Sequence, residues 1–188
     1  MSTVRILALV GSLRSGSHNR QLAEAAVKLA PEGVEIEIFE GLADIPFYNE
    51  DIDNPTDVPA SAVKFREAAG AVDAFLLFSP EYNGTTPGVL KNAIDWASRP
   101  MGSGVFVGKP LAVVGTAYGQ FGGVWAQDET RKASGIAGAS VLEDVKLSVP
   151  ESVIRFAERH PSDDSEIVEK LTVVVQQVAD ATKQPVEA

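Results

Sequence analysis

The 188-residue chain has no cysteine, only two histidines and fewer basic than acidic side chains. The absence of cysteine excludes disulfides, thiolate catalysis, iron–sulfur clusters and cysteine-bound zinc. His18 and His160 lie far apart in the sequence, which gives no support for a histidine-rich metal site. Sixteen basic against 26 acidic residues give a net charge of −10. This charge disfavours binding to nucleic acid or to an anionic membrane, so we expect neither as a partner.

Long hydrophobic runs are also missing, so no membrane-spanning segment is predicted. The N-terminus has one basic residue before a short apolar run, with Arg14 and Arg20 after it, which is not a signal-peptide pattern. Apolar residues make up 45% of the chain and charged residues 22%, as in ordinary globular proteins. We therefore expect a cytoplasmic protein whose residues 1–188 form a single domain.

Strand-like and helix-like segments alternate along the chain. Apolar or alternating runs predict strands over residues 4–10, 34–39, 74–78, 111–115 and 140–149. Periodic patterns and cap residues predict helices over 21–30, 60–69, 87 to about 98, a stretch after the glycines at 122 and 123, and a last helix capped within 162–164. In the third of these helices, Thr86 is the expected N-cap and Pro87 the first position. This order predicts an α/β three-layer sandwich around a parallel sheet.

The polarity of the strands predicts their order in the sheet. Strands buried on both faces are continuously apolar, whereas half-exposed strands alternate. The second strand alternates, and the fifth carries several charged residues, so both are expected at the edges. The flavodoxin-like order 2-1-3-4-5 places them there, whereas the order 3-2-1-4-5 would bury the second strand. Ligands of such sheets bind beyond the carboxyl ends of the strands, which here means the loops 11–19, 79–87 and 115–123.

The first of these loops has the properties of an anion site. A strand-to-helix turn presents free N–H groups at the positive end of a helix dipole. Ser12, Ser17 and Asn19 add side-chain donors, Arg14 adds a charge, and no acidic residue occurs in residues 1–23. The loop matches neither the P-loop nor the dinucleotide fingerprint. The competing interpretation is a serine-rich loop that only caps the helix, with Ser17 or His18 near the N-cap. His18 is interpreted as a solvated loop histidine and not as a catalytic base.

Together the loops carry three motifs of one known family. The motifs are Gly11-Ser12-Leu13-Arg14-x-x-Ser17-x-Asn19; Ser79-Pro80-Glu81-Tyr82-Asn83-Gly84 with Pro87-Gly88-x-Leu90-Lys91-Asn92-Ala93-Ile94-Asp95-Trp96; and Gly115 through Gly122-Gly123. In this order and after these strands, they resemble the NAD(P)H-dependent FMN reductases, flavodoxin-fold enzymes that include quinone, chromate and azo-dye reductases. The resemblance spans most of residues 4–135 and fades beyond about residue 138.

The resemblance implies a bound FMN, with NADPH or NADH as co-substrate and a quinone, free flavin, azo compound or similar small molecule as electron acceptor. The first loop would hold the phosphate, the second would run along the isoalloxazine ring, and the third would lie at its pyrimidine end. The implied cofactor-binding residues are Ser12, Arg14, Ser17, His18, Asn19, Pro80, Glu81, Tyr82, Asn83, Gly84, Thr116, Ala117 and Tyr118. No catalytic acid or base and no metal ligand is assigned, because the cofactor carries the chemistry.

Several residues of these loops have alternative interpretations. Tyr82 either contacts the flavin ring or packs beside the loop. The Glu81 carboxylate would disfavour an anionic flavin, so its side chain is expected to point away, toward a structural hydrogen bond or a subunit contact. Gly84 stands where some relatives carry an aromatic residue, which predicts a more open site, and its missing side chain would let the backbone approach the ligand. The third loop, taken alone, is also compatible with a simple turn of the chain.

Relatives are homodimers, sometimes paired into homotetramers. Trp96 is expected in the core or at a dimer interface and not in contact with the cofactor, and we expect the helix around it to be buried between subunits. The loop 45–50 is expected to reach toward the partner's site or to be a plain surface loop. A flavodoxin-type electron carrier, reduced by a partner protein, is the alternative function, and the acidic charge fits such docking. A flavin-free binding domain with the same fold is a third possibility.

Overall fold

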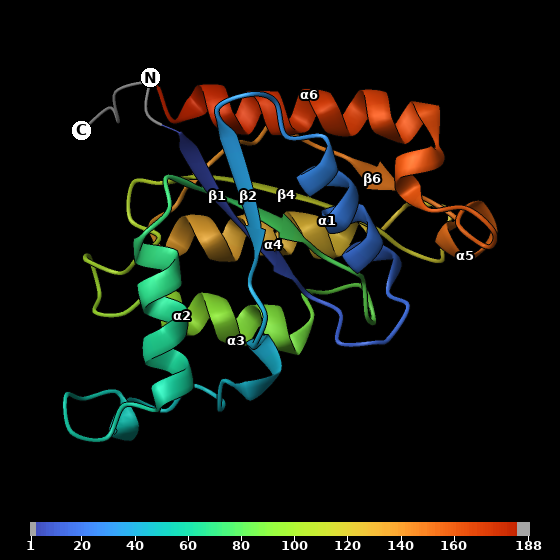
Figure 1. Ribbon diagram of the computed structural model, residues 1–188. Coiled ribbons are helices and arrows are strands. Elements are labelled where there is room, and N and C mark those ends of the chain that lie inside the picture. The colour runs from blue at the N-terminus through green and yellow to red at the C-terminus, as the bar shows by residue number, and fades with distance from the viewer. Residues whose placement is uncertain (1–2, 184–188) are drawn as a thin grey trace.

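The computed structural model describes residues 3–183, which form a parallel sheet between two helical layers (Figure 1). The strands follow the order β2-β1-β3-β4-β5, and β6 also pairs with β4. Their bounds are β1 Val4–Val10, β2 Val34–Ile38, β3 Ala74–Phe78, β4 Pro110–Thr116, β5 Ser140–Val141 and β6 Ser148–Val149. The predicted fold and strand order are therefore confirmed, including the edge positions of the second and fifth strands.

The fifth strand differs from the prediction of one continuous strand over 140–149. It is divided into β5 and β6, because the six residues 142–147 lie opposite only three residues of β4, 112–114. The extra residues cannot stay in a regular ladder and form a turn closed by a hydrogen bond from the Val145 N–H to the Leu142 carbonyl. Glu143 and Asp144 lie exposed in this turn.

Two apolar clusters, one on each face of the sheet, hold the layers together. On one face, α1 (His18–Lys28) and α6 (Ser165–Ala181) pack against the sheet. The other face is covered by α2 (Ala60–Gly70), α3 (Gly88–Ala97) and α4 (Val124–Ile136). The shorter elements are α5 (Ser152–Arg155) and the 3-10 helices Leu42–Asp44, Glu50–Ile52 and Pro161–Asp163. No helix within residues 3–183 is long and apolar enough to cross a membrane.

The caps of two helices test the predicted helix starts. The prediction of Thr86 as N-cap of α3 is wrong: Pro87 is the N-cap, with an extended backbone, and its carbonyl accepts from the Leu90 and Lys91 N–H groups. The Thr86 hydroxyl instead lies 3.1 Å from the hydroxyl of Thr130. The predicted capping of the last helix is confirmed at Asp164, whose carboxylate accepts from the Ile167 N–H.

Trp96 is a core residue of α3, which is one of the two positions expected for it, and the burial of the surrounding helix between subunits stays a prediction. The indole is fully buried within the single chain and donates from Nε1 to the Pro46 carbonyl at 2.8 Å. Asn92 holds the same loop: it donates to the Pro46 carbonyl at 3.0 Å and accepts from the Tyr48 N–H at 2.8 Å. Between these anchors, Phe47 is 83% exposed.

Candidate functional site

The loop after β1 ends in a capped helix and leaves several donors free. Ser17 is the N-cap of α1, and its hydroxyl oxygen accepts from the Arg20 N–H at 3.2 Å, as the capping interpretation predicted. Among the described residues, the N–H groups of 12–16 donate to no protein acceptor. Gly16 has a φ of +69°, a left-handed conformation that glycine adopts without strain. The loop therefore presents unpaired N–H groups at the positive end of α1.

Asn19 links this first loop to the end of β4. Its Nδ2 donates to the Thr116 carbonyl at 2.8 Å, and its Oδ1 accepts from the Thr116 N–H at 3.0 Å. Thr116 in turn donates from its hydroxyl to the Val149 carbonyl at 2.7 Å. The Asn19 side chain, predicted as an anion donor, is thus engaged within the protein and fixes the first loop against the third.

A cleft of about 550 Å³, which we call the three-loop cleft, opens beyond the carboxyl ends of β1, β3 and β4. Every implied cofactor-binding residue except Asn83 and Gly84 lines it. It is lined from the three loops by Ser12, Arg14, Ser17, His18, Asn19, Pro80, Glu81, Tyr82, Thr116, Ala117 and Tyr118. The topological rule for parallel sheets thus located the cleft correctly from the strand order.

The second loop forms a tight turn at the rim of this cleft. Tyr82 and Thr85 pair as an antiparallel bridge, and Asn83 and Gly84 between them both have positive φ, +55° and +75°. An Asn-Gly pair with two positive φ angles is typical of a type I′ turn. No atom lies within 4 Å of a Cβ built at Gly84. Within the protein, glycine is therefore favoured at this position by the positive φ and not by a lack of space. Tyr82 is half exposed, and its hydroxyl lies 3.4 Å from Ser12 Oγ.

The Glu81 carboxylate is held at the start of α4. Its Oε2 accepts from the Ala126 N–H at 3.1 Å, in the first turn of that helix. A carboxylate is stabilised there by the helix dipole. This contact confirms the expectation that Glu81 makes a structural hydrogen bond.

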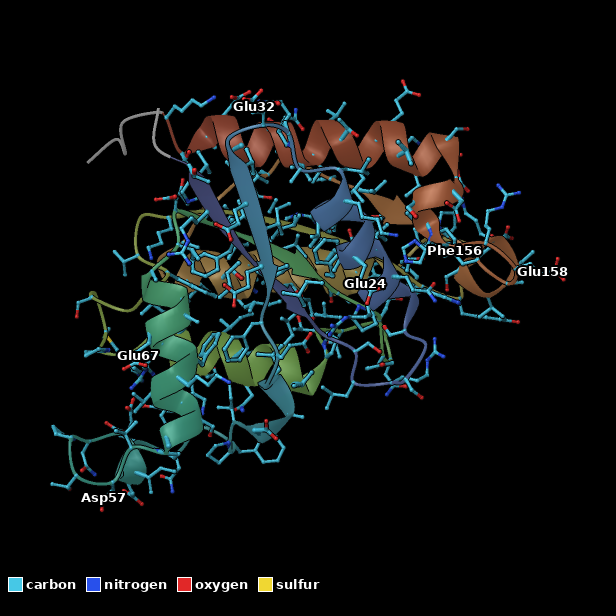
Figure 2. All side chains as sticks on the ribbon, in the orientation of Figure 1. Glu24, Glu32, Asp57, Glu67, Phe156 and Glu158 are labelled. Atoms are coloured by element: carbon cyan, nitrogen blue, oxygen red, sulfur yellow. The ribbon has the colours of Figure 1, made fainter. Side chains whose placement is uncertain are left out.

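Arg14 and His18 are the two basic side chains that line the three-loop cleft. Burial, and secondly the charge of Arg14, lower the pKa of His18 below its ordinary value, so the imidazole is neutral at pH 7. Its ring lies edge-on to Phe156, with 5.6 Å between the ring centroids, and Figure 2 shows Phe156 beside α1. Arg14 is exposed, and its guanidinium lies 3.4 Å from the Ser15 carbonyl. Arg14 therefore supplies the positive charge in the lining of the cleft.

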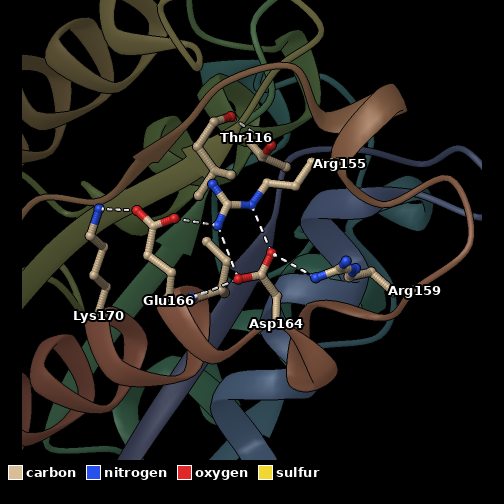
Figure 3. A network of polar contacts seen from close by, with 8 residues as sticks. Thr116, Arg155, Arg159, Asp164, Glu166 and Lys170 are labelled. Carbon is tan, nitrogen blue, oxygen red and sulfur yellow. Dashed lines mark hydrogen bonds and ion pairs between the residues drawn. The ribbon is translucent and has the colours of Figure 1, made fainter.

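The sequence analysis missed one wall of the cleft. Ser152, Val153, Phe156 and Ala157, in and after α5, complete the lining. Arg155 anchors this wall through two hydrogen bonds to Asp164, at 2.9 and 3.0 Å, and one to Glu166 (Figure 3). In the sequence, this wall could have been found from a cluster of apolar residues beyond the carboxyl end of the fifth strand, at the same sheet edge as the three loops.

The lining fits FMN in size, charge and donor chemistry. Cavities for such ligands are typically about 300–1,000 Å³, a range that contains the three-loop cleft. The unpaired N–H groups of 12–16 and the guanidinium of Arg14 suit a phosphate. The aromatic and small side chains of the second and third loops offer flat apolar surface for a ring system.

Comparisons with known proteins agree with this fit. The family model of the NADPH-dependent FMN reductases matches residues 4–153. A 2-hydroxy-1,4-benzoquinone reductase of Burkholderia is 39% identical and aligns over 90% of this chain and 88% of its own. An NAD(P)H-dependent FMN reductase of Pseudomonas aeruginosa is 42% identical over 82% and 80% of the two chains. The solved structure of the flavoenzyme NAD(P)H:(acceptor) oxidoreductase FerB of Paracoccus denitrificans has a TM-score of 0.86 at 31% identity, covering 96% and 98% of the chains.

The chain therefore belongs to the NADPH-dependent FMN reductase family. It is a flavoprotein oxidoreductase that uses FMN and NAD(P)H. The alternative of a flavodoxin-type carrier is not favoured by these relatives.

Proposed function

We propose that FMN binds in the three-loop cleft, with its phosphate over the first loop and its ring between the second and third loops. The convergence of three loops with unpaired N–H groups, a guanidinium and aromatic surface supports this placement. When bound, the flavin would supply the chemistry of hydride acceptance from NAD(P)H and two-electron transfer to the acceptor. The thirteen residues named in the sequence analysis are proposed to form the site, some in contact with FMN, Asn83 and Gly84 from the rim, and others by holding the loops in place.

Some of these residues are proposed to bind the FMN phosphate, and others to hold the loops in position. Arg14 and the N–H groups of 12–16 hold the phosphate, and Ser12 adds a hydroxyl. Ser17 and Asn19 are proposed to stabilise the site indirectly, because Ser17 caps α1 and Asn19 fixes the third loop. His18, neutral and packed edge-on against Phe156, adds no charge to the cleft lining. Each group binds or orients, and none is proposed to exchange a proton with substrate.

The proposed acceptor is a small molecule of the quinone, flavin or azo class, and NADH and NADPH are both proposed as donors. Relatives whose names describe quinone reduction support an acceptor of the quinone class. Both nucleotides are proposed because the sequence has no dinucleotide fingerprint. The cytoplasm is proposed as the place of the reaction, in keeping with the reductase family to which the chain belongs.

We also propose that the protein is a homodimer, with a homotetramer as a further assembly. The supporting feature is the outer face of α3 and α4, where Thr86, Lys91, Lys132 and Ile136 line a hollow of about 270 Å³. Ile136 is 80% exposed there, and a large apolar side chain in such a position suits a subunit contact.

Steady-state kinetics test the proposed function. Initial rates with NADH and duroquinone, both varied, should give parallel double-reciprocal lines, because the two half-reactions share one site and alternate. No other protein should be required. A requirement for a separate reductase before NADH is oxidised would instead identify a carrier.

A further inference from the structure

The second loop is attached to α4 by a closed chain of hydrogen bonds. Before the turn of this loop, Glu81 Oε2 accepts from the Ala126 N–H at 3.1 Å. After the turn, the Thr86 hydroxyl lies 3.1 Å from the Thr130 hydroxyl, which donates to the Ala126 carbonyl at 2.6 Å. A hydroxyl has one hydrogen, so Thr130 donates to Ala126 and accepts from Thr86. Both backbone groups of Ala126 are thus engaged in holding the loop, the carbonyl through Thr130.

A further contact joins the same two elements at the surface. The Thr85 hydroxyl donates to a carboxylate oxygen of Glu129. Residues 126, 129 and 130 are spaced so that they lie on one face of α4. Thr85 and Glu129 are exposed, whereas Thr130 is fully buried. Because water competes for exposed groups, we expect the buried contact between Thr86 and Thr130 to contribute more to the position of the loop.

The third loop is supported by the same helix. Gln127 is fully buried, donates from Nε2 to the Gly122 carbonyl at 3.0 Å and accepts from the Ser148 hydroxyl at 2.9 Å. Arg131, also buried, donates to the Val113 carbonyl of β4 at 2.8 Å. α4 is thereby fixed to the sheet, and it holds both loops between which the flavin ring is proposed to lie.

Between its two attachments, the second loop offers backbone donors. In the part of the chain that the structure describes, the N–H groups of Glu81, Asn83 and Gly84 donate to no protein acceptor. N–H dipoles that are already fixed in place stabilise negative charge on a neighbouring group without reorganising. Donors held in this way beside an isoalloxazine ring favour its reduced, more electron-rich form.

We propose that Thr130 is a positioning residue for the flavin reaction. It acts through the second loop, because its contact with Thr86 holds the N–H groups of residues 83 and 84 at the edge of the ring. The proposal rests on the placement of FMN in the three-loop cleft. Thr130 is not among the residues that line this cleft and is not proposed to contact the flavin.

Binding of FMN and of riboflavin to the apoprotein gives the first test. Thr130→Val keeps the shape of the side chain and removes the hydroxyl. It should weaken both ligands by the same factor, about 3- to 10-fold, because one lost hydrogen bond displaces the ring loop and leaves the phosphate loop intact. Thr130→Ser retains the hydroxyl and should bind both ligands nearly as well as the wild type. A loss confined to FMN, or no loss in Thr130→Val, would overturn the proposal.

The reduction potential of the bound flavin separates positioning from a purely structural role. When the donors of the second loop are displaced, the reduced flavin should be destabilised more than the oxidised flavin. The potential of Thr130→Val, measured anaerobically against a reference dye, should therefore be more negative than that of the wild type, and Thr130→Ser should restore it. Equal potentials in Thr130→Val and the wild type would contradict the proposed role.

Thr172→Val is the matched control for Thr130→Val. The Thr172 hydroxyl also donates to the carbonyl four residues earlier, that of Val168 at 2.7 Å, but on the exposed face of α6. Its removal should change neither ligand affinity nor the potential.

A double-mutant cycle tests the contact itself. Thr86→Val removes the other hydroxyl of the pair and should reproduce the losses of Thr130→Val. The double variant should lose no more than either single variant, because the same hydrogen bond is removed in each case. Additive losses would show that the two hydroxyls act separately and that Thr130 does not act through Thr86.

Two comparisons separate the possible failures. If the FMN placement is wrong, Arg14→Ala will show no loss specific to FMN over riboflavin. If only the positioning role is wrong, Arg14→Ala will keep that specific loss and Thr130→Val will bind both ligands like the wild type. A changed sedimentation coefficient of Thr130→Val would assign its effect to the hollow on the outer face of α3 and α4, which Thr85, Thr86 and Glu129 line, and would refute the proposal.

Discussion

Arg14 is the single residue on which phosphate binding is expected to depend most. Its guanidinium is exposed and lines the three-loop cleft. A charge-assisted hydrogen bond is worth about 1.5–3 kcal/mol, and exposure favours the lower half of that range. Arg14→Ala should therefore weaken FMN about 10- to 30-fold, with a loss that shrinks at high salt. Flavin fluorescence titration of the apoprotein measures it.

Riboflavin is the ligand control for Arg14→Ala, because it has the ring and lacks the phosphate. Its weaker binding should hardly change. Lys64→Ala removes a positive charge from an exposed position on α2 and should leave FMN binding unaltered. Equal losses for FMN and riboflavin would mean that Arg14 supports the loop and does not bind the phosphate.

Asn19 should matter for stability, since its amide is buried and satisfies both backbone groups of Thr116. Asn19→Ala leaves two buried polar groups unpaired, each costing about 1–3 kcal/mol. We expect the free energy of unfolding of the apoprotein in urea to fall by about 2–4 kcal/mol. Gln176→Ala, on the exposed face of α6, should change it by less than about 0.5 kcal/mol. An Asn19 variant as stable as that control would show that the link is unimportant.

Sequence reasoning identified residue types better than residue partners. The glycine, serine and arginine pattern of the first loop indicated an anion site, and the N–H groups of residues 12–16 in that loop donate to no acceptor among the described residues. The partner of Asn19 was not foreseeable, because 97 residues separate it from Thr116. The sequence left the core and the interface open for Trp96 for a related reason: its indole is hydrogen-bonded to a loop 50 residues away, a contact that no local pattern reports.

At the scale of elements, α5 is a wall of the cleft that the ion pair between Arg155 and Asp164 helps to anchor. Arg155 is bonded to Asp164, which also caps α6. Asp164→Asn keeps a good N-cap but removes the anion. We expect the free energy of unfolding at pH 7 to fall by about 1–3 kcal/mol, within the range for charge-assisted bonds.

The same pair predicts a dependence on pH. The hydrogen bond from Arg155 is the main cause that lowers the pKa of Asp164 in the folded protein. The resulting stability is complete above the ordinary aspartate pKa of about 3.9 and is lost as the pH falls below it. Thermal unfolding between neutral pH and pH 3 should show a smaller loss for Asp164→Asn than for the wild type. Parallel curves for the two proteins would rule out this contribution.

The elements themselves were largely predictable, because their signals are local. Continuous apolar runs indicated the central strands, and the alternating second strand lies at the sheet edge. The division of β5 from β6 was not predictable, since it depends on how many residues of β4 lie opposite the segment. The wall formed by α5 was missed because a four-residue helix is too short to show a period.

For the whole molecule, the outer face of α3 and α4 is where we expect a second copy. Ile136→Glu places a charge on the face that the proposed dimer would bury, and should shift the sedimentation coefficient from dimer to monomer. Ile136 is 80% exposed in the single chain, so the substitution should leave the melting temperature of the monomer nearly unchanged. A variant that remains dimeric would place the subunit contact elsewhere.

Anaerobic reduction of the purified holoprotein tests the central claim most directly. The protein should be yellow, with one FMN per chain, and NADH or NADPH alone should bleach the visible flavin absorbance. Subsequent addition of duroquinone should restore the colour, which shows that both half-reactions occur on one protein. A yellow protein that neither nucleotide bleaches until a second protein is added would contradict the account.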